Sequence, residues 1–258
     1  MRIRISVLAC VLSTPLAVLL VCSAHAAPLP RSALASPASP IIVIGFVGGH
    51  ARHDDDAYLA VQVAARLKQD YASGVYVQVF ENRFREKAYQ KILCLLDADR
   101  DGLLSPDEMR RARIVLYGQS WGASETVALA RELKREGIPV LLTIQVDSVH
   151  KFGENDKVIP ANVAEAVNFY QPHGLVHGRR HIRAENPETT HILGNYKIDY
   201  NLDPVPCRNY PWFASVFLRS HTEIECDPRI WTRIESLIRS KLSTSETSAS
   251  TSALSGLQ

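Results

Sequence analysis

Apolar runs alternate along the chain with segments in which apolar residues recur at helical spacing. The run at 41–47, IIVIGFV, is followed by glycines and has the continuous β-branched character of a strand buried on both faces. The other predicted strands are 74–80, 112–118 and 138–147, with weaker candidates at 164–171 and 191–200. The predicted helices are 57–71, 84–97, 121–137 and 228–242. This alternation predicts an α/β fold, a mostly parallel sheet with helices on both faces.

The N-terminal residues 1–26 have the pattern of a secretory signal peptide. Arg2 and Arg4 precede an apolar run, and Ala24-His25-Ala26 offers a cleavage site of small residues. We therefore expect an exported protein, periplasmic or extracellular. An uncleaved membrane anchor is the alternative, although the apolar run is short for a bilayer span.

Two further segments differ in composition from the rest of the chain. Residues 27–39 form a Pro/Ala/Ser leader, and residues 243–258 form a Ser/Thr-rich tail. Neither can bury enough apolar surface to offset the entropy of ordering it, so both are expected to be disordered. A single folded domain is predicted at 40–242.

Composition and charge exclude some classes of partner. The chain is 46% hydrophobic and 22% charged, as in ordinary globular proteins, and loss of Arg2 and Arg4 with the signal would leave equal numbers of basic and acidic residues. This balance gives no electrostatic case for binding to nucleic acid or to an anionic membrane surface, and no stable membrane insertion is expected after signal cleavage. Of the mature cysteines, Cys207 and Cys226 could pair in an oxidising compartment, a question the sequence leaves open, while Cys94 in the apolar KILCLL run is expected to be a buried free thiol.

Candidate chemistry begins with Ser120 in Gly118-Gln119-Ser120-Trp121-Gly122. This is the G-x-S-x-G pattern of a nucleophile elbow, and it lies between a predicted strand and a predicted helix, as that turn requires. The alternative is a tight strand–helix turn with an ordinary serine. A serine needs a base and an acid to act as a nucleophile, so both must be found downstream.

Asp147 is the predicted acid, because it ends the strand that follows the nucleophile helix and so lies at the same sheet edge as Ser120. Asp199, at the end of a weaker strand, is the second choice. His221 is the predicted base, in a loop just before the last helix. His173, His177 and His181 have i, i+4, i+8 spacing, but the glycines between them argue against a helix, and solvated loop histidines are preferred to a zinc site. 

Acyl chemistry also needs hydrogen-bond donors for the developing oxyanion. One should be the backbone N–H of Trp121, the residue after the nucleophile. The other is expected from the glycine-rich GFVGGH loop at 45–50, with Phe46 and Val47 as the candidate donors and His50 lining the pocket. The full dinucleotide and P-loop patterns are missing from this loop, which argues against nucleotide binding.

Together, GFVGGH, YGQSWGAS, IQVDSV and SHTEIE resemble the α/β-hydrolase superfamily, and more narrowly small secreted bacterial lipases or thioesterase-like hydrolases. The resemblance spans about 41–242 and implies an α/β-hydrolase-like sheet with a Ser120, Asp147, His221 triad. One departure is that Asp147 follows the first strand after the nucleophile, as in the thioesterase-like branch, whereas most of the superfamily places the acid one strand later. The chain also lacks a long insertion that could form a lipase lid.

A second motif, DADRDGLLSPDE, precedes the nucleophile strand and fits the twelve-residue EF-hand calcium loop. Gly102 provides the sharp turn of that loop. The predicted ligands are Asp97, Asp99, Asp101, the carbonyl of Leu103, Ser105 and Glu108. The helix–loop–helix at 84–112 has room for only a short second helix, which suits a structural site better than a sensor. An acidic solvated loop is the alternative.

The sequence therefore predicts an exported serine hydrolase that cleaves a carboxylic ester or thioester, with structural Ca²⁺ and no organic cofactor. A different class remains open, namely a catalytically inactive, calcium-dependent binding or scaffold protein on a hydrolase fold. Acyl transfer would use the same triad. The sequence fixes neither the small-molecule substrate nor the oligomeric state.

Overall fold

The computed structural model describes residues 3–4, 40–207 and 218–254. Most of the predicted signal peptide, the whole leader and the last four residues of the predicted tail therefore lie outside the described residues. No helix within the described ranges is long and apolar enough to cross a membrane.

A six-stranded sheet forms the centre of the molecule, and every neighbouring pair of its strands is parallel. The strands are β2 (Ile41–Val47), β3 (Val75–Glu81), β5 (Arg113–Gln119), β6 (Val140–Val146), β8 (Val163–Tyr170) and β10 (His191–Lys197). They lie in the order β10-β8-β6-β5-β2-β3, so β5 is central and β2 lies between β5 and β3. The predicted strands all form, within a few residues of their expected bounds.

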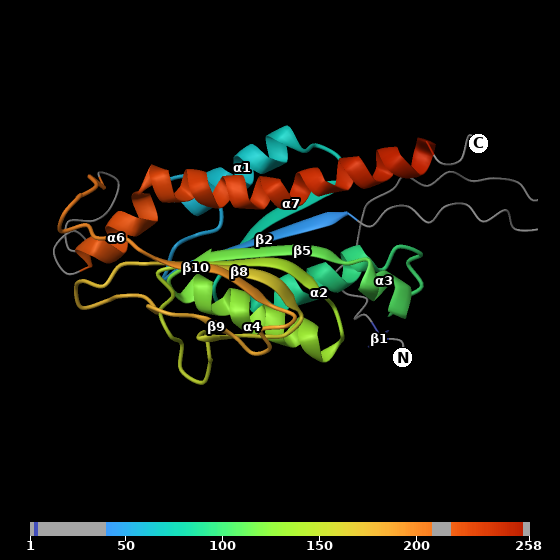
Figure 1. Cartoon of the computed structure of the whole chain (residues 1–258), viewed down its shortest axis with the longest axis horizontal. Helices are drawn as coiled ribbons and strands as arrows, with labels where there is room; N and C mark the ends of the chain where they lie inside the picture. Colours follow the sequence, from blue (N-terminus) through green and yellow to red (C-terminus); the bar gives the residue numbers. More distant parts are fainter. Residues whose placement is uncertain (1–2, 5–39, 208–217, 255–258) are drawn as a thin grey trace, which may run out of the picture.

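Helices cover both faces of this sheet, which confirms the predicted fold class (Figure 1). Helices α1 (Leu59–Asp70) and α7 (Pro228–Leu254) lie on one face, and α2 (Arg85–Leu96) and α4 (Trp121–Arg135) lie on the other. Parallel strands joined by crossover helices require this arrangement, because each strand then buries side chains on both faces.

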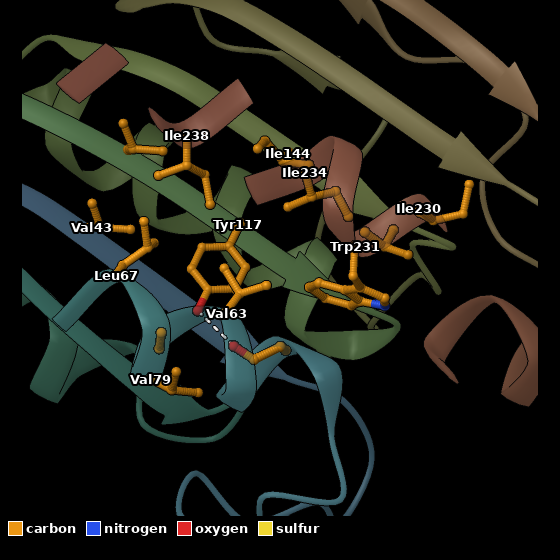
Figure 2. Close-up of a cluster of buried hydrophobic side chains, with 14 of the residues drawn as sticks. Val43, Val63, Leu67, Val79, Tyr117, Ile144, Ile230, Trp231, Ile234 and Ile238 are labelled. Atoms are coloured by element: carbon orange, nitrogen blue, oxygen red, sulfur yellow. Dashed lines mark hydrogen bonds between the residues drawn. The ribbon is translucent and has the colours of Figure 1, made fainter. Parts of the chain in front are cut away.

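The core consists of two layers of buried side chains, one on each side of the sheet. In β2, Ile42 and Ile44 pack toward the α2 and α4 face, while Val43 packs toward α1 and α7. Figure 2 shows this second layer around Tyr117, whose hydroxyl donates to the carbonyl of Ala60 (2.9 Å). The alternation explains why β2 reads as an unbroken apolar run.

The remaining elements are short, and the sequence predicts few of them. Strand β1 (Ile3–Arg4) pairs antiparallel with β4 (Leu103–Leu104), β7 (Val158–Ile159) pairs with β9 (Arg183–Ala184), and α3 (Pro106–Arg110) precedes β5. Two-residue strands leave no detectable periodicity in a sequence.

Helices α6 and α7 differ from the expectation. His221 was expected in a loop, but it lies in α6 (Arg219–Cys226), an eight-residue helix too short to show a clear apolar repeat. Helix α7 was expected to end at 242, where the predicted tail begins, and it continues to Leu254. No proline or glycine interrupts the chain between Pro228 and Gly256, so nothing in the sequence stops the helix.

A disulfide joins Cys207 to Cys226 at the end of α6, with a Cα–Cα distance of 5.9 Å. The pairing that the sequence left open is therefore present in the structure. Cys94 is also disulfide-bonded, so the expectation of a free thiol there is wrong. An apolar neighbourhood favours burial of a cysteine but does not prevent its pairing.

Candidate active site

Ser120 lies on a strained turn between the end of β5 and the start of α4. Its backbone has φ 56° and ψ −124°, a conformation that side-chain-bearing residues rarely adopt. The turn is also crowded, because a Cβ at Gly118 would strike the carbonyl of Gly122, and one at Gly122 would strike the carbonyl of Phe46. Both glycines of the motif are therefore required by close backbone contacts.

His221 and Asp147 complete a hydrogen-bonded chain with this serine. The Ser120 hydroxyl donates to Nε2 of His221 (2.9 Å), and Nδ1–H of the same ring donates to Oδ2 of Asp147 (2.6 Å). The carboxylate can only accept, so it places the proton on Nδ1 and leaves Nε2 free as a base. The structure thus brings together three residues that lie on β5–α4, at the end of β6 and on α6.

The environment of His221 changes its proton affinity in two directions. Burial lowers the pKa of the ring, but the hydrogen bond and charge of Asp147, together with the charge of Glu225, outweigh burial and raise the pKa above its ordinary value. Asp147 is fully buried and His221 is nearly so. The pair is therefore built to hold an imidazolium next to a fixed carboxylate.

Asp147 is oriented by partners that the sequence did not reveal. Its Oδ1 accepts from the backbone N–H of Gly178 (2.7 Å) and of Gln171 (3.2 Å), and its Oδ2 also accepts from the Gln171 side chain (2.8 Å). A Cβ at Gly178 would strike Asp147, so only glycine permits this approach. These contacts come from the loop after β8, and its conformation has no periodic signal in the sequence.

Asp199, the second candidate acid, lies elsewhere. It pairs with Nε2 of His173 (2.9 Å) and with Lys197 (3.0 Å), and His221 is not among its partners. His173, His177 and His181 belong to no cluster of metal-ligating side chains in the described part of the chain.

The loop after β2 approaches Ser120 closely at Gly48, where a Cβ would lie 2.7 Å from Cβ of Ser120. Phe46 and Val47, the predicted oxyanion donors, are buried and still inside β2, in register with strand neighbours.

The turn that follows leads toward Trp121. Gly49 has φ 47°, and the ring of His50 meets the ring of Trp121 edge-on, with centroids 6.4 Å apart. Trp121 is the first residue of α4, so its N–H has no partner within the helix.

The EF-hand-like segment forms a compact acidic turn. Asp97, Asp99 and Glu108 each place a carboxylate oxygen within 4.8 Å of the others, the only such group of three in the described residues. Gly102 has φ 78°, and its N–H donates to Oδ2 of Asp97 (3.1 Å). Ser105 caps α3 in a reciprocal capping box with Glu108.

Two features of Asp97 favour a cation at this turn. Oδ1 of Asp97 is buried and has no hydrogen-bond partner among the described groups. Burial raises the pKa of Asp97, the hydrogen bond from Gly102 opposes this, and the charges of Glu108 and Asp99 raise the pKa further. A bound cation would relieve both the unpaired oxygen and the repulsion. Asp101 and Ser105 lie outside the group of three, and the Ser105 hydroxyl donates to Glu108 (2.7 Å).

The acidic turn and Ser120 lie at opposite ends of the same strand. The turn leads through α3 into the start of β5, whereas Ser120 follows the last residue of β5. Figure 1 shows α3 at one edge of the sheet and α6, which carries His221, at the other.

No protein-family model matches the sequence, and no curated protein sequence matches it. Two solved structures show a partial likeness. One is RedJ with a polyethylene glycol molecule bound in its active site, at 10% identity, covering 74% of this chain and 91% of RedJ, with a TM-score of 0.36. The other is a protein described as a hydrolase of the alpha/beta superfamily from Xanthomonas campestris pv. campestris, at 13% identity, covering 77% of this chain and 98% of that one, with a TM-score of 0.33. Both TM-scores are below 0.5, so the likeness to these two structures is limited.

Proposed function

We propose that the protein is a serine hydrolase that cleaves a carboxylic ester or thioester through Ser120, His221 and Asp147. The observation that supports this most is the continuous hydrogen-bonded chain from the Ser120 hydroxyl through His221 to the buried carboxylate. The strained backbone of Ser120 adds to it, because such strain persists only where the surrounding structure holds it.

The reaction follows from the roles that these atoms can play. Oγ of Ser120 attacks the substrate carbonyl while Nε2 of His221 takes the hydroxyl proton, and Asp147 stabilises the resulting imidazolium. The tetrahedral intermediate collapses, its carbon–oxygen or carbon–sulfur bond breaks, and His221 returns the proton to the leaving alcohol or thiol. Water, deprotonated by the same histidine, then hydrolyses the acyl-serine and releases the acid.

The oxyanion of this intermediate requires backbone donors near Ser120. The N–H of Trp121 is one, since it stands at the free N-terminal end of α4. The second is proposed to come from the end of β2 and the turn after it, where Gly48 adjoins Ser120. Glycine at position 48 is what allows a main-chain donor to come this close.

Calcium is proposed as a resident structural ion, held by Asp97, Asp99 and Glu108 with help from Asp101, Ser105 and the Leu103 carbonyl. It would neutralise the negative charge of the acidic turn, and it would take no part in the reaction. Export fits this role, because even a weak extracellular-type site with a Kd of roughly 10⁻⁴–10⁻³ M is filled where calcium is abundant. The substrate is a small molecule, and no organic cofactor is required.

A panel of p-nitrophenyl acyl esters of graded chain length tests the proposal. We expect the wild-type protein to hydrolyse members of the panel and Ser120→Ala to lose at least about 10³-fold in kcat. Ser124→Ala is the matched control, because Ser124 is also buried, lies one turn further along α4 and has an unbonded hydroxyl among the described groups. Equal activity of Ser120→Ala and wild type would contradict the proposal. Calcium-dependent retention of a partner without any hydrolysis would instead support the scaffold alternative.

A further inference from the structure

The turn after β2 has an amide side chain on one side and the proposed nucleophile on the other. Because β2 lies between β3 and β5, the chain leaving β2 passes between Asn82, which follows β3, and Ser120, which follows β5. The turn itself is closed by a hydrogen bond from the N–H of Ala51 to the carbonyl of Gly48 (3.0 Å).

Asn82 sets the orientation of one peptide in this turn. Its side-chain amide, nearly buried, donates to the carbonyl of Gly49 (2.6 Å). In a planar trans peptide the C=O and the N–H point in opposite directions. With the Gly49 carbonyl directed to the β3 side, the N–H of His50 in the same peptide is directed to the β5 side, where Ser120 lies.

A chain of polar contacts ties Asn82 to the nucleophile helix. Nζ of Lys151 donates to the carbonyl of Asn82 (3.3 Å) and approaches its side-chain oxygen (3.5 Å). Lys151 also pairs with Glu125, which is 2% exposed and accepts from Arg85 (2.7 Å). Glu125 belongs to α4, the helix that follows directly after Ser120. The turn and the serine are thus held to the same rigid element.

We propose that Asn82 is a positioning residue that aims the turn's backbone donor at the oxyanion. This rests on the hydrolase function proposed above and goes beyond it by naming the group that organises the oxyanion hole. Within the part of the chain that the structure describes, the side chain of Asn82 bonds to Gly49 and Lys151 and not to His221. It acts through the Gly49–His50 peptide, with Lys151 and Glu125 fixing its place.

Two variants test the role. Asn82→Ala removes the donor, and Asn82→Asp keeps the volume but turns an acceptor toward the Gly49 carbonyl. Loss of a single oxyanion donor costs about 10²–10³-fold in kcat, so misaiming one is expected to cost about 10–100-fold, with KM nearly unchanged. Asn162→Ala is the matched control. Asn162 also donates its amide to two backbone carbonyls, of Ala130 (3.0 Å) and Ile138 (2.8 Å), but precedes β8 at the opposite sheet edge.

Three readouts separate positioning from general destabilisation. Melting temperature is measured for every variant, and we expect Asn162→Ala to lose stability but keep kcat within about 3-fold. The rate of inactivation by a fluorophosphonate, whose phosphoryl oxygen occupies the oxyanion position, should fall with kcat in both Asn82 variants. The acid limb of the pH profile, which reports His221, should not move.

The outcomes are distinguishable. Wild-type kcat in both Asn82 variants, an equal loss in Asn162→Ala, or a shifted acid limb would each overturn the positioning role while leaving the hydrolase proposal intact. If the fluorophosphonate does not react with wild-type Ser120, the proposed function itself fails and this inference fails with it. If Asn82→Ala does not fold, the kcat of Asn82→Asp alone tests the positioning role.

Discussion

Asp147 shows how much of the site depends on single residues. Its own backbone is strained, with φ 45°, and its carboxylate is hydrogen-bonded to Gln171 and Gly178 as well as to His221. These hydrogen bonds fix the carboxylate beside His221, where its hydrogen bond and charge favour the protonated imidazole. The pKa of His221 is raised on balance for this reason, despite burial.

The pH dependence of activity should therefore change in Asp147→Asn. His221 must be neutral to take the serine proton, so wild-type activity should fall as pH drops through the raised pKa. Without the carboxylate, burial remains and lowers the pKa, so the acid limb should move to lower pH. A kcat loss of about 10³–10⁴-fold should accompany this shift. The measurement is the pH profile of kcat/KM.

Asp199→Asn is the control for that experiment. Asp199 pairs with His173 and Lys197, so its loss should leave the profile in place. A shift in Asp199→Asn instead of Asp147→Asn would contradict the assignment of the acid.

At this scale the sequence predicted the residues of the proposed triad better than the residues that hold them in place. Ser120 and Asp147 end apolar strands, and parallel strands bring their carboxyl ends to one edge, so their proximity could be inferred. Gln171, Gly178, Gly48 and Asn82 act from loops, and their contacts depend on backbone conformations that no periodicity encodes.

Among the elements, the acidic turn and α3 together lead into β5. We expect calcium to raise the melting temperature and EGTA to lower it, because an ion that binds only the folded chain stabilises it by about 1–3 kcal/mol at ten to a hundred times its Kd. This corresponds to roughly 2–10 °C for a domain of this size. Differential scanning fluorimetry with and without calcium measures it.

Two aspartate variants of the acidic turn test whether the calcium response comes from this site. Asp97→Asn should weaken the calcium response, whereas Asp107→Asn should not, because Asp107 is exposed and pairs with Arg110 outside the group of three carboxylates. A melting temperature indifferent to calcium in the wild-type protein would refute the structural site.

The disulfide Cys207–Cys226 fastens the helix that carries His221. The Cys207→Ser, Cys226→Ser double variant should lose about 3 kcal/mol of unfolding free energy, as expected for closing a loop of this length. Activity should fall as well, since α6 ends at Cys226 and loses its tether there. Urea unfolding and ester hydrolysis measure the two effects. Unchanged values for both would show that the disulfide does not hold α6.

Long periodic elements were predictable and short ones were not. The six strands of the central sheet and the four long helices follow from apolar runs and helical repeats. Helix α6 and the strand pair β7–β9 are too short to carry a repeat. The C-terminal extension of α7 arises because serine, threonine and alanine permit a helix when no breaker intervenes.

For the whole molecule, β5 links the two motifs that stand close together in the sequence. The acidic turn lies before its first residue and Ser120 after its last, so the strand separates a proposed ion site from a proposed reaction site. Calcium should therefore affect activity only through stability of the fold. All residues of β5 after Arg113 are buried, so the two sites are joined through packed core and share no residue.

Reaction with a fluorophosphonate probe shows whether Ser120 is an activated nucleophile. We expect one adduct per chain by intact mass, mapped to Ser120 by peptide sequencing and lost in Ser120→Ala. Ser124→Ala should label as the wild type does, and heat-denatured protein should not label. Labelling of Ser120→Ala at the wild-type rate, or no labelling of the native protein, would show that Ser120 is not an activated nucleophile.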